Sequence, residues 1–200
     1  MSILFVISAP SGTGKSTILR DARRTDAQLA FSRSYTTRAP RGPERDGVDY
    51  HFTTKEDFER RAAAGEFLEF ANVFGNYYGT HESEIERAAA SGCDLVMDID
   101  VQGARQLQKR VVDAVLIFVL PPDRTELERR LRARSQDQPE VIERRLREAK
   151  AETTQYDIYD YILINDELDA AVGDLRSIIR AERLRRKRME GPVQRVLGSF

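Results

Sequence analysis

The sequence has no tryptophan, two histidines and a single cysteine, Cys93, among its 200 residues. One cysteine excludes an internal disulfide framework, and the first residues lack the basic segment of a secretory signal peptide. We therefore expect a protein of the reducing cytoplasm. Because no apolar run reaches the roughly 18 residues that a membrane-spanning helix needs, we also expect no membrane partner.

Net charge is nearly absent as well, because 33 acidic side chains offset 32 basic ones and leave a formal charge of −1. This balance excludes a polycation built to coat nucleic acid, so we expect no nucleic-acid partner. The basic run at 183–188 is more typical of a solvated helix end or a subunit contact. A hydrophobic content of 40% excludes disorder of the whole chain.

Apolar runs alternate with segments of helical spacing along most of the chain. The apolar runs predict buried strands at 2–8, 94–100, 114–122 and 159–165. Strands that alternate with helices indicate an α/β fold with a parallel sheet covered on both faces. The predicted helices lie at 18–24, 82–91, 101–110, 124–154 with a break near 135–139, and 168–189.

The segment 32–80 has a different character, being polar and rich in Arg, Pro, Gly and Thr. It predicts a helix at 55–64 that follows Thr54 as its N-cap, and small antiparallel strands that turn near Gly75. We interpret this segment as a subdomain inserted between the two parts of the core, 1–31 and 81–200.

The strongest motif, APSGTGKST at 9–17, stands between an apolar strand and a helix. It matches the phosphate-loop pattern, with Ala9 in place of the first glycine. Glycines let backbone N–H groups turn toward a phosphate, Lys15 can reach the outer phosphates, and Ser16 can ligate Mg²⁺. An ordinary glycine-rich turn would have no use for the lysine. The predicted nucleotide-binding residues are Ser11, Gly12, Thr13, Gly14, Lys15, Ser16 and Thr17.

Two aspartates, Asp98 and Asp100, end the second apolar strand, where open α/β sheets place their ligands. A carboxylate at this position can hold Mg²⁺ or a water molecule of its shell. The alternative is a carboxylate that caps a helix or a turn. We predict a metal site at Ser16 and Asp98, with Asp100 near the substrate.

Five further blocks share the order and spacing of one family: SYTTRAPR at 34–41, GVDYHF at 47–52, GEFLE at 65–69, GNYYGT at 75–80 and DIDVQG at 98–103. Together with the phosphate loop, they make the chain resemble guanylate kinase from about residue 3 to 185. This family transfers the γ-phosphate of ATP to GMP. The resemblance implies a phosphate-loop three-layer fold with a GMP-binding insertion at 32–80 and a helical lid near 124–150. It also implies ATP as co-substrate, Mg²⁺, and GMP as acceptor, with dGMP left open.

The resemblance also implies residue roles on the acceptor side. Arg pairs bidentately with a phosphate dianion, and phenols donate hydrogen bonds without adding charge. Arg45 lies outside the motif, and we expect it to be solvated. The residues implied to hold the GMP phosphate are Arg38, Arg41, Tyr50 and Tyr78; those implied to read guanine are Ser34, Glu69 and Thr80, with Asp100 nearby.

On the donor side, the resemblance implies that Arg130, Arg134 and Arg145 reach the ATP phosphates when the lid closes, with Arg132 and Arg147 as alternatives. Ser135 stands where the family usually has glycine, which predicts a stiffer hinge. Asn165 falls where the family contacts adenine, although an asparagine there is also an ordinary turn former. We expect no nucleophile or essential general base, and structural roles for His51 and His81. The implied catalytic residues are Lys15, Arg38, Arg130, Arg134 and Arg145.

Two related functions remain as alternatives. One is a guanylate-kinase-like binding module without catalysis, which the intact Gly14-Lys15-Ser16 sequence and the lid arginines disfavour. The other is a kinase acting on a phosphorylated sugar, which would lack the base-reading set of Ser34, Glu69 and Thr80.

Overall fold

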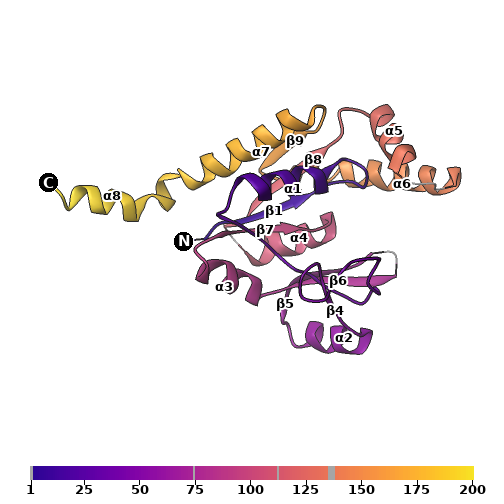
Figure 1. Cartoon of the computed structure of the whole chain (residues 1–200), viewed down its shortest axis with the longest axis horizontal. Coiled ribbons are helices and arrows are strands. Elements are labelled where there is room, and N and C mark those ends of the chain that lie inside the picture. Colours follow the sequence, from indigo (N-terminus) through magenta and orange to yellow (C-terminus); the bar gives the residue numbers. More distant parts are fainter. Residues whose placement is uncertain (1, 74, 112, 135–137) are drawn as a thin grey trace.

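A computed structural model describes residues 2–73, 75–111, 113–134 and 138–200. Within these residues, a five-stranded parallel sheet forms the centre of the molecule (Figure 1). The predicted α/β fold with a parallel sheet is therefore confirmed. The edge strand β2 was not predicted, because its three residues give no readable pattern. In spatial order the strands are β2 (Leu29–Phe31), β7 (Asp94–Asp98), β1 (Leu4–Ser8), β8 (Val115–Leu120) and β9 (Tyr161–Ile164).

Helices cover both faces of this sheet. On one face, α1 (Lys15–Thr25) and α7 (Leu168–Arg183) pack apolar side chains against the strands. On the other face, α3 (Ser83–Ala90) and α4 (Val101–Arg110) enclose a second part of the core. The predicted strand at 94–100 is too long, because Asp100 already serves as the N-cap of α4.

A second sheet lies beyond α4, which packs against its strand β5 (Figure 1). Strands β5 and β6 pair as an antiparallel hairpin, and Gly75 near its turn has the left-handed φ of 83° that glycine favours. The ring of Phe58 stacks between Phe67 and Tyr77, with centroids 4.6 and 5.2 Å away. The strand order is β4 (His51–Phe52), β3 (Tyr35–Thr36), β6 (Asn76–His81) and β5 (Phe67–Val73).

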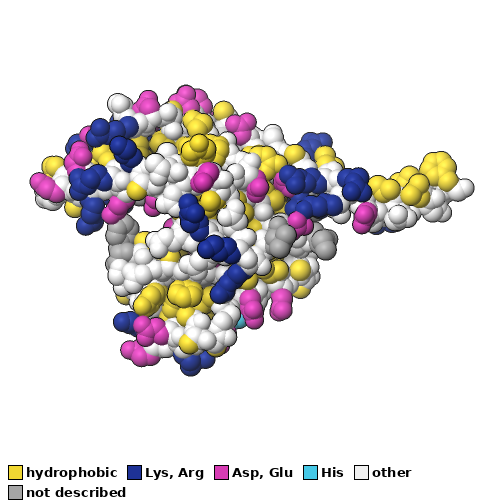
Figure 2. Space-filling model, turned by 180° about the vertical axis from the view of Figure 1, so that it is seen from behind, with side chains coloured by type: hydrophobic (Ala, Val, Ile, Leu, Met, Phe, Trp, Pro, Cys, Tyr) yellow, Lys and Arg dark blue, Asp and Glu magenta, His cyan; other side chains and the backbone are white. Residues whose placement is uncertain are grey.

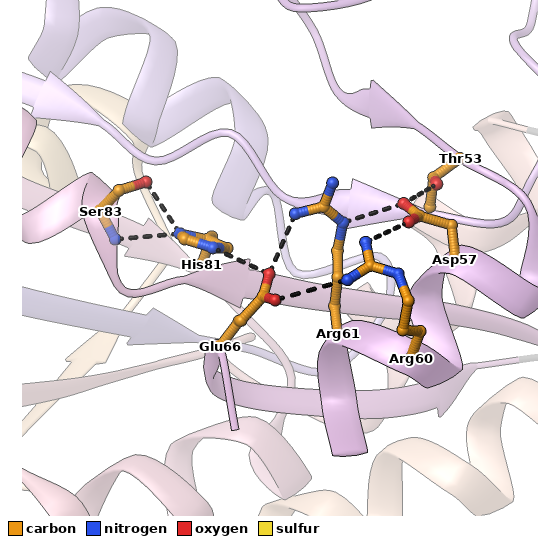
Figure 3. Close-up of polar contacts among 7 residues, drawn as sticks. All are labelled: Thr53, Asp57, Arg60, Arg61, Glu66, His81 and Ser83. Atoms are coloured by element: carbon orange, nitrogen blue, oxygen red, sulfur yellow. Dashed lines mark hydrogen bonds and ion pairs between the residues drawn. The ribbon is translucent and has the colours of Figure 1, made fainter. Parts of the chain in front are cut away.

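Helix α2 (Lys55–Ala63) begins at the predicted N-cap, where the Thr54 hydroxyl accepts a hydrogen bond of 3.2 Å from the N–H of Asp57. An ion-pair network then fastens the helix to the sheet (Figure 3). Asp57 accepts from Arg61 at 2.9 Å, and Arg61 also donates to Glu66 at 3.0 Å. Glu66 in turn lies 3.4 Å from the ring of His81, which gives this histidine a structural environment.

The predicted two-part helix at 124–154 is confirmed as α5 (Arg124–Arg134) and α6 (Pro139–Thr153), which share their own small core. The predicted terminal helix at 168–189 is wrong in its extent. Helix α7 ends at Arg183, because Arg185 adopts an extended conformation with ψ of 134°. A short 3₁₀ helix, η2 (Arg186–Arg188), and a separate helix, α8 (Glu190–Leu197), follow it. Within the described residues, no helix is long and apolar enough to cross a membrane.

Candidate active site

The loop of residues 9–14 joins β1 to α1 and has the geometry of an anion cradle. Gly12 and Gly14 adopt left-handed φ angles of 93° and 91°, which strongly favour glycine. Helix α5 packs close to the loop at Gly12, where an added Cβ would lie only 2.7 Å from the side chain of Leu131. The loop carbonyl of Thr13 accepts hydrogen bonds from Asn165 Nδ2 at 2.6 Å and from an Arg130 Nη at 3.2 Å. These two hydrogen bonds fix the position of the loop at the N-terminus of α1, which is a favourable place for a phosphate group.

A cavity of about 540 Å³ opens in front of this loop. Residues 9–16 form one wall, and Asn72 and Val73 of β5 reach it from the second sheet. Helix α6 supplies Arg145, Glu148 and Glu152. The cavity thus lies between the phosphate loop, the second sheet and helix α6, and Arg145 lines it.

Lys15 forms an ion pair with Asp98, and its ammonium also lies 3.4 Å from the carbonyl of Ile99. Ser16 and Asp98 line a second cavity, of about 480 Å³, together with Ser34 and Tyr50. Because Ser16 lines both cavities, the two meet at the first turn of α1. A group held in one cavity can therefore approach a group held in the other.

Three of the four predicted phosphate-holding residues on the second sheet come together around Arg38, which is 9% exposed. Its Nε donates to the Tyr78 hydroxyl at 3.1 Å, and its Cζ lies 5.3 Å from the ring centre of Tyr50. Two further guanidinium nitrogens donate to Glu44 at 2.9 and 3.0 Å, which raises the pKa of Arg38 above its already high value. Arg41 meets this cluster through its backbone N–H, 2.7 Å from Glu44, while its side chain is exposed.

The predicted base-reading residues also converge. Glu69 is 3% exposed and lies opposite Thr80 in the β5–β6 register, and the Thr80 hydroxyl lies 3.4 Å from that of Ser34. Burial and the nearby charge of Asp100 raise the pKa of Glu69 to about 7, against hydrogen bonds from Thr80 that lower it. A buried carboxylate beside two hydroxyls offers acceptors and donors in one small region.

Asp100 performs the helix-capping role that the sequence left as an alternative, since it accepts the N–H of Gly103 at 2.8 Å. It lines the phosphate-loop cavity as well. Asp98 has a different partner, because its carboxylate forms an ion pair with Lys15. The two strand-end aspartates therefore have different environments.

Comparison with known proteins adds independent findings. The guanylate kinase family model matches residues 1–182. The chain is 54% identical over 186 residues to a guanylate kinase of Koribacter versatilis, covering 92% of this chain and 80% of the relative. A guanylate kinase of Aliivibrio fischeri is 52% identical over 184 residues, with 91% and 89% of the two chains covered.

The chain belongs to the guanylate kinase family.

Solved structures agree with this membership. The crystal structure of guanylate kinase from Anaplasma phagocytophilum superposes with a TM-score of 0.74 at 31% identity, covering 94% of this chain and 89% of that one. A shikimate kinase from Bacteroides thetaiotaomicron, at 17% identity and a TM-score of 0.50, shares the fold.

The arginines that the resemblance assigns to a lid differ in their placement. Arg130 is held by Glu126 at 2.6 Å and reaches the phosphate loop through Thr13. Arg132 instead pairs with Glu128 at 2.7 Å, and Arg147 lines a separate cavity behind α6. The side chain of Arg134 and the hinge residue Ser135 lie outside the described residues. Asn165 is 4% exposed and holds the loop with its amide, so its structural role in this guanylate kinase is evident.

Sequence reasoning assigned no role to several residues that shape the site. Glu44 clamps Arg38, and Gly103 leaves room for Glu69, because a Cβ there would lie 2.5 Å from its carboxylate oxygen. Gln106 binds both the N–H and the carbonyl of Phe70, at 3.2 and 2.7 Å. Glu152 faces the phosphate-loop cavity, and burial raises its pKa to about 7. Gly103 lies within a family block and Glu44 lies between two of them, so their positions in the sequence were the available signal; Glu152 lies in no such block.

Proposed function

We propose that the chain transfers the γ-phosphoryl group of ATP to GMP, giving ADP and GDP, through the residues described above. The observation that carries this proposal is the meeting of two cavities at Ser16, one lined by the phosphate loop and one by residues of the second sheet. Direct phosphoryl transfer needs its two substrates to face each other in line, and two adjoining sites supply this arrangement.

The second sheet with its helix, residues 32–80, is the proposed GMP-binding subdomain. Arg38, Tyr50 and Tyr78 form the phosphate site, and Arg41 joins them when the ligand is bound. Glu44 pre-orients the Arg38 guanidinium by its bidentate contact, so that the fork is already rigid when a phosphate arrives.

Guanine selection is assigned to Glu69, Thr80 and Ser34. The ionised Glu69 carboxylate accepts from N1–H and the 2-amino group, while the hydroxyls donate to O6. Adenine offers a bare lone pair at N1 and lacks the 2-amino group. A buried carboxylate without a donor is strongly unfavourable, and sites of this type discriminate by roughly 10⁴–10⁵-fold.

The donor side is assigned to the phosphate loop and the lid. The Ser16 hydroxyl and the Asp98 carboxylate are hard oxygen donors suited to Mg²⁺, which in nucleotide sites takes most of its other ligands from phosphates and water. Bound Mg²⁺ neutralises charge on the β- and γ-phosphate oxygens.

Lys15 and the lid arginines act on the phosphate charge that spreads in the transition state. Lys15 must leave Asp98 to reach the outer phosphates, so nucleotide binding releases this carboxylate at the same time. Arg130, already at the loop, Arg145 at the cavity wall, and Arg134 are the proposed cations of the lid. We expect the helices α5 and α6 to close over this open cavity when both substrates are bound, which excludes water from the γ-phosphate. We place this reaction in the cytoplasm, as the single cysteine suggests.

The substitution Lys15→Ala tests the proposal. We expect turnover to fall by about a thousandfold or more, because Lys15 stabilises charge that grows in the transition state. GMP affinity, measured by calorimetry, should stay nearly unchanged, since GMP binds the second sheet. Lys55→Ala, at an exposed lysine of α2, is the matched control and should keep full activity. Retention of more than about a tenth of wild-type turnover by Lys15→Ala would show that the phosphate-loop assignment is wrong.

A further inference from the structure

Two side chains of helix α4 bind the backbone of strand β5. Among the described residues β5 is the edge of the second sheet, with β6 as its only neighbouring strand. The Oε1 of Gln106 accepts from the N–H of Phe70 at 3.2 Å, and its Nε2 donates to the carbonyl of Phe70 at 2.7 Å. An Nη of Arg110 donates to the carbonyl of Phe67 at 2.7 Å and lies 3.5 Å from that of Leu68. The carboxamide of Gln106 thus bonds to β5 as the peptide groups of a further strand would.

Strand β5 is irregular in the segment that these two side chains bind. Phe67 lies opposite His81 on β6. Glu69, two residues further along β5, lies opposite Thr80, which is only one residue from His81. Leu68 is therefore the additional residue of a β-bulge, a feature that interrupts the ladder of hydrogen bonds and bends the strand.

The bulge determines the direction of the Glu69 side chain. In a regular strand Phe67 and Glu69 would lie on the same side of the sheet. Helices α2 and α4 lie on opposite sides of the second sheet (Figure 1). Phe67 stacks on Phe58 of α2, whereas the carboxylate of Glu69 approaches Gly103 of α4. Leu68 also packs toward the part of the core that α3 and α4 enclose. The additional residue therefore turns Glu69 toward α4.

One face of α4 carries all the contacts to this segment. Gly103, Gln106 and Arg110 are spaced by three and four residues, which places them on the same side of the helix. Gly103 leaves room for the carboxylate, and the two longer side chains bind the backbone before and after Glu69. In an active site a displacement of about 1 Å can lower the rate by about a hundredfold. The conformation of the bulge therefore matters for any task of Glu69.

We propose that Gln106 and Arg110 are positioning residues for guanine selection, because they hold the β5 bulge in the conformation that directs the Glu69 carboxylate to the base. This inference rests on the proposed role of Glu69 in reading guanine. Neither side chain is among the described residues that line the two substrate cavities. Both act through the strand and not by contact with a substrate.

A double-mutant cycle separates this role from a merely structural one. If the two side chains only fastened the second sheet to the core, their loss would affect the enzyme equally whether residue 69 is a carboxylate or an amide. If they position the carboxylate, their loss has little effect once Glu69→Gln has removed it. Each substitution is therefore made in the wild type and in the Glu69→Gln enzyme.

Gln106→Met removes both hydrogen bonds to Phe70 at nearly constant side-chain length. Its matched control is Gln108→Met on the same helix, because the amide of Gln108 donates to the carbonyl of Ile158, at 3.2 Å, and not to β5. We expect Gln106→Met to lower the specificity constant for GMP by about tenfold. The KM for ATP should stay at its wild-type value, and Gln108→Met should match the wild type in both constants.

Arg110→Met provides a second variant with little risk to folding. Arg110 is exposed, and basic side chains lie on the surface between the core and the second sheet (Figure 2). We expect a smaller fall in the GMP constant, of about threefold, because Gln106 still holds Phe70. In the Glu69→Gln enzyme both substitutions should change the GMP constant by less than about twofold. If Gln106→Met does not fold, Arg110→Met decides the question alone.

The possible outcomes distinguish this inference from the proposed function. Equal losses in the wild type and in the Glu69→Gln enzyme would overturn the positioning role and leave only a structural one. Wild-type GMP constants for both Gln106→Met and Arg110→Met would also overturn it, while the role of Glu69 would stand. A Glu69→Gln enzyme whose preference for GMP over AMP is unchanged would instead contradict the proposed function, and this inference with it.

Discussion

At the scale of single residues, the site depends on side chains whose ordinary chemistry is changed by burial. Glu69 is the clearest case, because desolvation and Asp100 raise its pKa to about 7. A group in this range is divided between its neutral and ionised forms near neutral pH. Guanine needs the ionised form, since N1–H and the 2-amino group are both donors. Base recognition in this guanylate kinase should therefore depend on pH.

We predict that GMP affinity rises with pH and levels off above the pKa of Glu69. One unit below that pKa about one-tenth of the carboxylate is ionised, so the dissociation constant should be about tenfold larger than at the plateau. Calorimetric titrations from pH 6 to pH 8.5 would measure this. Glu69→Gln is the control, because it removes the titration of Glu69 and retains those of Glu152 and of the GMP phosphate near pH 6. Identical pH profiles for the two proteins would contradict the role of Glu69.

At the scale of elements, the sequence predicted what depends on local pattern. The phosphate loop and the central strands follow from hydrophobic spacing and glycine placement, and Pro139 marks the start of α6. Strand β2 and helix α8 were missed, since a strand of three residues and a short helix after a charged run carry too little local signal. Contacts between segments far apart in the sequence, such as Asn165 with Thr13, form only when the chain folds and leave no periodic pattern in the sequence.

Helix α4 illustrates how one element serves the site. Asp100 caps its N-terminus, and Gly103 in its first turn leaves space for the carboxylate of Glu69 on β5. The sequence block that contains Gly103 pointed to the family but not to this contact. The glycine is explained by the approach of a neighbouring side chain.

We predict that Gly103→Ala lowers the specificity constant for GMP by about ten- to a hundredfold, on the scale of a 1–3 kcal/mol steric mismatch. The added Cβ would displace Glu69 from its position opposite Thr80. Gly173→Ala in α7 is the matched control, because a Cβ there meets nothing within 4 Å. Steady-state kinetics with GMP as the varied substrate would measure both. An unaffected Gly103→Ala enzyme would mean that Glu69 does not need its observed position.

At the scale of the whole molecule, the parallel sheet and the second sheet carry different parts of the site. The parallel sheet presents the phosphate loop at the end of β1, and the second sheet presents the residues proposed to read the acceptor. The cavities of the two layers meet at Ser16. We propose that Glu69, on the second sheet, decides which nucleoside monophosphate receives the phosphoryl group from ATP bound at the phosphate loop.

The most direct test compares the specificity constants for GMP and AMP in the wild type and in Glu69→Gln, by ADP release. The amide supplies one acceptor instead of two and carries no charge. The specificity constant for GMP should therefore fall by a factor that corresponds to about 2–4 kcal/mol of lost transition-state stabilisation. AMP should gain relative to GMP, because the amide can donate to adenine N1. A large fall in the GMP to AMP ratio is the predicted result, and an unchanged ratio would contradict the claim.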